Sequence, residues 1–308
     1  MSAPKSHAFE QLVCSGGGTR CCWQGGWLDV VRDEIGLNPD RITGVSGGAG
    51  TAAGFITRRG RMFLDGLCSA FSDLESNMDP HAIGEDGWSP HQRMYREVAA
   101  DIFDASAMAE VADGPPFQIL IGHPPAGALA RLTGTAATLA YEAELHLIGS
   151  PHFDWAEKIG VTSTLVDARQ AAAEGKLAEL ICAAAVIPPL FEPPLWDGKP
   201  VIDGGMADQA PMPQPDQGRT LILLTRPYDR IPQIEQRSYI SPTKRSRPTR
   251  STLPTRPSCA GHGKPAKRTG ANTCQSSAMA QIEQRVSLRC CQAMTSRLNG
   301  LWLKQNCV

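Results

Sequence analysis

The sequence predicts an α/β fold with a mainly parallel central sheet flanked by helices. Through the first 240 residues, strand-like apolar runs alternate with helix-like stretches, and Gly-rich turns follow the first two strand candidates. The expected strands are 9–14, 41–45, 117–122, 143–149, 163–167, 199–203 and 219–225. The expected helices are 24–34, 48–59, 91–103 and 176–186. Residues 61–116 are less regular, and their large apolar side chains are interpreted either as core or as a cap over an apolar pocket.

The second strand candidate ends in a Gly-x-Ser-x-Gly pentapeptide, in which Gly44 and Gly48 flank Ser46. A strand that turns sharply into a helix holds its turn residue in strained geometry, and the glycines let the neighbouring chains approach closely. The helix that follows directs unpaired amides to the place where an oxyanion would form. An ordinary Gly-rich turn has the same composition, so further motifs are needed to identify Ser46 as a nucleophile.

The first strand candidate leads into a second Gly-rich turn, residues 15–20 (SGGGTR). In such a turn the backbone amides of Gly16, Gly17 and Gly18 can converge on one negative oxygen. A nucleotide phosphate fits less well, because the Gly-x-Gly-x-x-Gly spacing and a following Gly-Lys-Ser/Thr are absent. We therefore interpret this turn as a candidate oxyanion hole.

A third motif, residues 201–205 (VIDGG), is a short apolar run that ends in Asp203, Gly204 and Gly205. This is how the end of a strand would present a carboxylate. The alternative is a plain Asp-Gly turn, which is what we expect for Asp197 and Gly198. The two preceding motifs favour a functional role for Asp203.

Taken in this order, the three motifs resemble those of the patatin-like phospholipase family, over roughly residues 8–240. The resemblance implies a three-layer α/β/α fold and hydrolysis of lipid acyl esters by a Ser-Asp dyad through an acyl-serine intermediate. Ser46 would then be the nucleophile and Asp203 the base. The oxyanion hole would be formed by the amides of Gly16, Gly17 and Gly18.

The same resemblance assigns supporting roles around these groups. Arg20 matches the basic residue that ends the family's glycine loop, and the flanking glycines of the other two motifs are Gly44, Gly48, Gly204 and Gly205. The chain departs from the family at Cys21 and Cys22, where a glycine usually follows the basic residue. This departure affects the course of the turn but leaves its amide donors.

A Ser-His-Asp triad is an alternative, and in α/β-hydrolases its histidine follows the acid. The only histidine after Asp203 is His262, which lies in a basic, Pro-rich stretch without apolar periodicity. Earlier histidines would be out of order. A dyad needs no histidine and predicts a direct hydrogen bond between Asp203 and Ser46, roughly 2.6 to 3.2 Å long. No metal or cofactor is expected, because no His-Glu-x-x-His, Asp-x-Asp or Cys-x-x-Cys motif is present.

Residues 241–308 differ from the rest of the chain. They contain 12 of the 30 Lys and Arg residues but only one of the 31 acidic ones, and residues 241–274 contain almost no large apolar groups. We therefore expect an acyl hydrolase domain at 1–240 and a disordered, basic, low-complexity tail at 241–308. With suitable synonymous codons, a one-base shift of the reading frame lets residues 251–270 encode what looks like ordinary globular sequence with an amphipathic helix. Our hypothesis is that the tail is a frameshifted product, which sequencing the gene would test.

Composition also bears on location and partners. The N-terminus lacks the apolar core of a signal peptide, and no run approaches the ~18 apolar residues of a membrane span. We expect a cytoplasmic protein that contacts membranes only peripherally, acts on a lipid or fatty-acyl ester, and binds no nucleic acid. The alternative function is a catalytically inactive or regulatory lipid-binding protein of the same fold. Retention of both Ser46 and Asp203 favours the enzyme.

Overall fold

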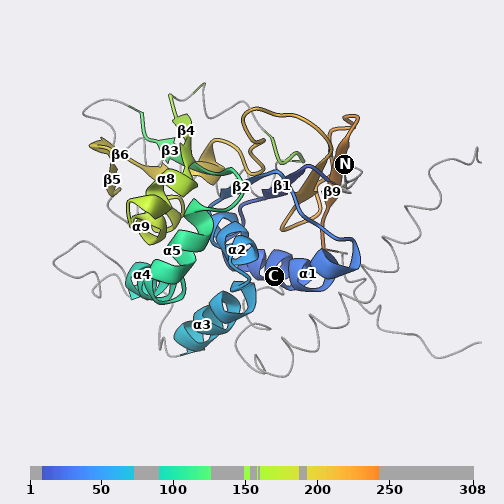
Figure 1. The fold of residues 1–308 in the computed structure, drawn as a ribbon. Helices are drawn as coiled ribbons and strands as arrows, with labels where there is room; N and C mark the ends of the chain where they lie inside the picture. The colour runs from blue at the N-terminus through green and yellow to red at the C-terminus, as the bar shows by residue number, and fades with distance from the viewer. Residues whose placement is uncertain are drawn as a thin grey trace, which may run out of the picture. The chain divides into compact units, whose positions relative to one another are not determined.

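A mixed, mostly parallel sheet forms the centre of the protein in the computed structural model (Figure 1). The structure describes residues 9–72, 90–125, 149–152, 158, 160–186 and 193–242. The strand order is β4-β3-β2-β1-β8-β9, with β7 (Ile202–Asp203) paired to β3 off this path. The parallel strands are β1 (Gln11–Cys14), β2 (Arg41–Val45), β3 (Phe117–His123), β8 (Thr220–Leu223) and β9 (Arg237–Ile240). Strand β4 (Thr162–Asp167) is antiparallel to β3.

Strand β1 lies between β2 and β8, and all four of its residues are buried. A strand covered on both faces is mostly apolar rather than alternating, which explains the run Leu12–Cys14, while the buried side chain of Gln11 hydrogen-bonds to Thr220 and Asp216. Cys14 is in register with Gly44 of β2 and with Leu223 of β8. The turns that follow β1 and β2 therefore leave the sheet at the same edge.

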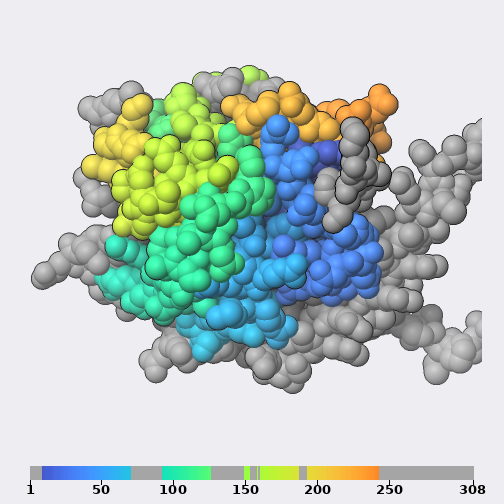
Figure 2. Space-filling model, in the orientation of Figure 1, coloured from blue at the N-terminus to red at the C-terminus, as the bar shows by residue number. Residues whose placement is uncertain are grey.

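The fold is of the three-layer α/β/α class, and most of the labelled helices lie together below strands β1 and β2 in Figure 1. The helices are α1 (Cys21–Glu34), α2 (Gly47–Ile56), α3 (Gly60–Ser72), α4 (Pro90–Ile102), α5 (Ala105–Ala112), α8 (Ala168–Ala173) and α9 (Leu177–Ala183). Helix α2 consists mostly of buried Gly, Ala and Thr residues, so it packs closely against β1 and β2. In Figure 2, α4 and α5 (green) lie beside the segment of α8 and α9 (yellow-green), with which they are in contact.

The expected strand 199–203 is wrong as a single element. Lys199–Pro200 (β6) pairs with Leu195–Trp196 (β5), whereas Ile202–Asp203 (β7) pairs antiparallel with β3. Pro200 has no backbone N–H with which to continue a ladder, so the chain changes partners there. As a result, Asp203 lies opposite Ile121 at the centre of the fold.

The expected turn at Asp197 and Gly198 is confirmed, and it joins β5 to β6. Both residues have positive φ, 49° and 73°, as a two-residue hairpin turn of type I′ requires. Residues 61–116, which were expected to be less regular, contain α4 close to the expected helix 91–103 and also α3 and α5, which were not expected. Asp104 caps α5 by accepting a hydrogen bond from the amide of Ala107.

Several expectations fall on residues that the structure does not describe. These are most of the strand expected at 143–149 and the tail beyond residue 242, so both remain predictions. Strand β9 and helix α8 were not expected. Within the described ranges, no helix is long and apolar enough to cross a bilayer.

Candidate active site

Ser46 occupies the sharp turn between β2 and α2. Its backbone has φ 54° and ψ −136°, in the left-handed region that a non-glycine residue rarely enters. A Cβ atom at Gly48 would overlap the carbonyl oxygen of Cys14, and one at Gly44 would lie 2.7 Å from the Cα of Ala49. Both glycines are therefore required for the turn, and the turn presents the Ser46 side chain beyond the end of the strand.

The hydroxyl of Ser46 meets Asp203 directly. Ser46 Oγ donates to Asp203 Oδ2 at 2.6 Å, and the backbone N–H of Gly205 donates to Asp203 Oδ1 at 2.7 Å. Asp203 ends β7, and a Cβ at the next residue, Gly204, would overlap the carbonyl oxygen of Leu120 on β3. Close backbone packing against β3 thus sets the position of the carboxylate.

The environment of Asp203 makes its carboxylate more basic than an exposed one. The residue is only 1% exposed, and burial raises its pKa to about 6, although the hydrogen bonds from Ser46 and Gly205 act in the opposite direction. A carboxylate with this pKa is ionised at pH 7 and is closer in basicity to the group whose proton it would accept. This combination is typical of a general base.

The glycine loop (residues 15–20) lies against the same turn. A Cβ at Gly16 would be 3.3 Å from the Cβ of Ser46. The hydroxyl of Thr225 donates to the carbonyl of Gly16 at 2.7 Å, and the guanidinium of Arg20 donates to the carbonyl of Gly17 at 3.3 Å. Arg20 therefore supports the loop through the main chain.

The three expected amide donors are not equivalent. The N–H of Gly16 donates to the carbonyl of Gln209 at 2.9 Å, so this amide is occupied. The amides of Gly17 and Gly18 have no hydrogen-bond partner within the described part of the chain, and both residues have positive φ, 152° and 57°. The unpartnered pair is the part of the loop that is available to an anion.

An apolar cavity of about 210 Å³ adjoins Ser46 and Gly18. Its walls come from α1, α3, α4 and α9 and include Phe63, Leu64, Leu67, Met94, Tyr95 and Val186. This agrees with the interpretation of residues 61–116 as part of a pocket wall. The cavity is larger than one of about 150 Å³ that accepts benzene, so an apolar chain of a few carbons fits inside.

Three cysteines contribute to the same wall. Burial raises the pKa of Cys22 and Cys182 to about 12 and that of Cys21 well above its ordinary value. At neutral pH all three are thiols, which behave as small apolar groups rather than as nucleophiles. Cys21, where the sequence departs from the resembled pattern, donates its thiol to the carbonyl of Ser15 and so packs under the glycine loop.

The model of the patatin-like phospholipase family matches residues 12–216, more than half of the chain. The match includes the glycine loop, the Ser46 turn and Asp203. The chain belongs to the patatin-like phospholipase family. A search of curated proteins gives no match. Strands β8 and β9 and Thr225, which supports the glycine loop, lie beyond the matched patatin-like segment.

The described histidine side chains have hydrogen-bond partners other than Ser46 and Asp203. His123 contacts the carbonyl of Pro200 and the hydroxyl of Thr164, and His152 contacts Asp208 and Tyr239. Other candidates, including His81, His146 and His262, fall outside the described residues. Within those residues, no three His, Cys, Asp or Glu side chains gather as a metal site would require.

Two residues at this patatin-like site were not predicted from the sequence. Thr225 supports Gly16, and Gln209 contacts both the glycine loop and the segment after Asp203. Thr225 is the last residue of the expected strand 219–225, and Gln209 lies in the segment 206–211 that resembles the family's sequence after Asp-Gly-Gly. Neither residue was assigned a role of its own.

Proposed function

We propose that this protein is a carboxylic ester hydrolase that cleaves lipid or fatty-acyl esters with a Ser46–Asp203 dyad. The observation that carries the proposal is the 2.6 Å hydrogen bond from the Ser46 hydroxyl to the buried Asp203 carboxylate, beside an apolar cavity. Family membership supports lipid acyl hydrolysis in general. The cavity walls favour an apolar acyl chain over a polar group.

In the first half of the reaction, Ser46 Oγ attacks the carbonyl carbon of the ester while Asp203 accepts the hydroxyl proton. The negative charge that develops on the carbonyl oxygen is stabilised by the amides of Gly17 and Gly18. When the C–O bond to the alcohol breaks, the alcohol takes the proton from Asp203. An acyl-serine then remains.

The second half repeats these roles with water. Asp203 accepts a proton from water as the water oxygen attacks the acyl carbon, and the same two amides stabilise the second oxyanion. The bond to Ser46 Oγ then breaks, and the proton returns from Asp203 to the serine. The products are a carboxylic acid and the free enzyme.

Hydrolysis of a medium-chain p-nitrophenyl ester and of a phospholipid, together with fluorophosphonate labelling, tests this proposal. We expect Ser46→Ala to lose both labelling and hydrolysis, because no other described hydroxyl is paired with a buried carboxylate beside the cavity. Asp203→Asn removes the proposed base. Its matched control is Asp113→Asn, which makes the same change at an exposed position on the surface. A folded wild type that neither labels nor hydrolyses would instead support an inactive lipid-binding protein.

A further inference from the structure

Gln209 lies where two loops of the site meet. These are the glycine loop (residues 15–20) and the acid loop, which we define as residues 203–211. Gln209 is only 2% exposed, and its carbonyl accepts the hydrogen bond from Gly16 N–H at 2.9 Å. Its own N–H donates to the carbonyl of Pro151 at 3.2 Å. The main chain of Gln209 therefore joins the acid loop to the start of the glycine loop.

The side chain of Gln209 hydrogen-bonds within the acid loop, next to Asp203. Its Nε2 donates to the carbonyl of Gly205 at 2.9 Å, and the N–H of Gly205 donates to Asp203 Oδ1 at 2.7 Å. Gly205 is thus held at both its N–H and its C=O. By holding the carbonyl of Gly205, the bond from Gln209 restrains the residue whose N–H orients the carboxylate.

The amide group of Gln209 also fills the space between the two loops. A Cβ at Gly16 would lie 2.7 Å from Gln209 Oε1, and a Cβ at Gly205 would lie 2.7 Å from Gln209 Nε2. Both glycines leave room for this one side chain. The loops are therefore in contact with opposite ends of the same amide.

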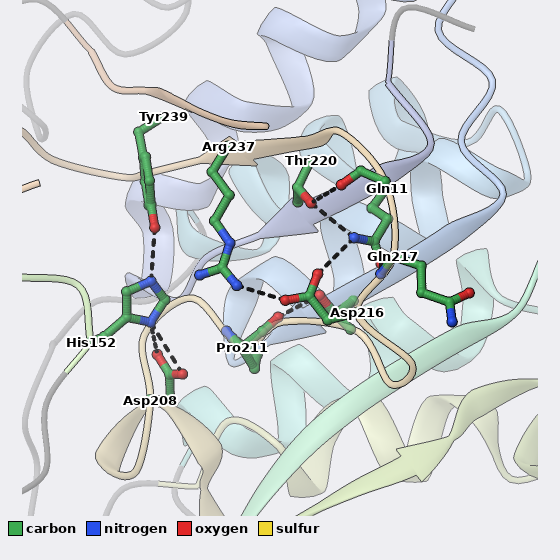
Figure 3. Close-up of polar contacts among 11 residues, drawn as sticks. Gln11, His152, Asp208, Pro211, Asp216, Gln217, Thr220, Arg237 and Tyr239 are labelled. Carbon is green, nitrogen blue, oxygen red and sulfur yellow. Dashed lines mark hydrogen bonds and ion pairs between the residues drawn. The ribbon is translucent and has the colours of Figure 1, made fainter. Parts of the chain in front are cut away.

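The residues on both sides of Gln209 are themselves held in place (Figure 3). Asp208 Oδ1 contacts Nδ1 of His152 at 3.0 Å, and Nε2 of His152 contacts the hydroxyl of Tyr239 at 3.2 Å. The carbonyl of Pro211 accepts a hydrogen bond from Thr43 Oγ1 of β2 at 2.6 Å. These contacts hold the acid loop against β9 and β2. The main chain of Gln209 is therefore held in place, and its side chain can orient the neighbouring groups.

We propose that Gln209 is a positioning residue that holds the glycine loop and the acid loop in a fixed position relative to each other. The oxyanion donors and the carboxylate then approach Ser46 together. This inference rests on the proposed function for its consequence in catalysis, but the coupling of the two loops can be measured without it.

The coupling has a consequence for the charge state of Asp203. Loss of the bond from Gln209 weakens the hold on Gly205 N–H, which stabilises the ionised carboxylate, so the pKa of Asp203 rises further. Cys21 and Tyr95 are the titratable groups whose charges would also reach Asp203. Burial raises the pKa of both groups, so they stay neutral over the acidic part of the pH–activity profile and do not obscure the shift in the pKa of Asp203.

Gln209→Met tests the inference, because Met has a similar length and shape but no amide. We expect kcat for a p-nitrophenyl ester to fall about tenfold with KM changed less than twofold, and the acid limb of kcat/KM to move upward by about half a pH unit. Gln209→Asn, which keeps a shorter amide, should restore part of kcat. We also expect faster hydrogen exchange in the peptides that cover 15–18 and 203–206.

Gln11→Met is the matched control, because Gln11 is an equally buried glutamine at the opposite end of β1. It should lower the melting temperature while the acid limb and both exchange rates stay at their wild-type values. The inference is overturned if Gln209→Met leaves exchange unchanged in either peptide, or if the two variants alter exchange and the pH profile alike. Failure of the proposed function has a different signature, because Ser46→Ala would then keep the wild-type activity and labelling.

Discussion

The two ends of the central parallel strands differ in how their polar groups are satisfied. At the amino ends, Gln11 donates to Thr220 and Asp216, and Asp216 also accepts a hydrogen bond from Arg237 (Figure 3). At the carboxyl ends, Ser46 is strained, a carboxylate is buried, and two amides of the glycine loop lack partners within the described residues. Strain and unsatisfied groups persist where they serve a ligand, so the carboxyl ends favour function and the amino ends favour stability.

The largest expected effect is a difference in activity between variants of two aspartates, one at each end of the central parallel strands. Asp203→Asn should reduce kcat/KM on the order of 10⁴-fold, because Asn cannot accept the serine proton. It should not lower the melting temperature, since it removes a buried charge. Asp216→Asn should keep the activity and lower the free energy of unfolding by about 0.5 to 1 kcal/mol, because it weakens a partly exposed ion pair. Kinetics and thermal melts of both variants measure this contrast, and equal activity in the two would contradict it.

The second prediction concerns backbone approach at the carboxyl ends. Gly48→Ala should lower the free energy of unfolding by more than about 3 kcal/mol, because the added Cβ would overlap the carbonyls of Cys14 and Ser15, which are backbone and cannot rotate away. Gly25→Ala is the control within helix α1. Its Cβ meets nothing within 4 Å, so we expect a gain of about 0.5 to 1 kcal/mol. Urea denaturation of both variants is the measurement, and a stable Gly48→Ala would refute the packing argument.

The third prediction is a pH dependence that arises from Asp203. Its pKa is about 6 in the folded protein and lower in the unfolded chain, so between about pH 4 and pH 6 the folded state binds more protons. The contribution of this group to stability is therefore present at low pH and is lost as the pH rises through about 6. Activity should change in the opposite direction, with kcat/KM rising through about pH 6 as the base ionises.

Asp203→Asn serves as the control for this pH dependence. Melting temperatures of the wild type and the variant, measured from pH 4 to pH 8, should converge at low pH, with the wild type becoming relatively less stable as the pH rises. Parallel curves would show that Asp203 titrates with an ordinary pKa. The rise of kcat/KM through about pH 6 would then have to come from the ionisation of another base.

The smallest expected effect compares two tyrosines. The hydroxyl of Tyr95, beside the cavity, is buried without a hydrogen-bond partner in the part of the chain that the structure describes, whereas that of Tyr239 contacts His152. Tyr95→Phe should raise the free energy of unfolding by about 1 kcal/mol, and Tyr239→Phe should lower it by a similar amount. Chemical denaturation distinguishes the two signs. A destabilised Tyr95→Phe would indicate a partner for this hydroxyl.

Local patterns were sufficient to predict much of the fold. The strand 41–45 has the expected bounds, and the strands and helices around the glycine loop and Ser46 differ from expectation by only a few residues. These elements are consecutive in the chain, and their signals are the apolar runs and glycines of the elements themselves. Strand 199–203 failed because Pro200 and the partner strands, rather than its own apolar run, decide where pairing stops.

The residues of the candidate site also differ in whether local sequence patterns could identify them. Ser46, Asp203 and the glycines could be named because each belongs to a motif whose composition follows from close backbone packing. Gln209 and Thr225 could not, because their importance lies in what they contact across the fold. The occupied amide of Gly16 belongs to this second group, since its partner is 193 positions away in the chain.

By itself, the sequence determined the α/β class, the Gly-flanked turn at Ser46 and the residues of the proposed dyad, since glycine spacing and apolar periodicity act over short distances. Tertiary structure alone decided that Ser46 and Asp203 lie within a hydrogen bond of each other, that Asp203 is buried enough to raise its pKa to about 6, and that the amide of Gly16 is occupied by the carbonyl of Gln209. The physical reason is that hydrogen bonding and desolvation depend on distances between segments, which no local pattern contains.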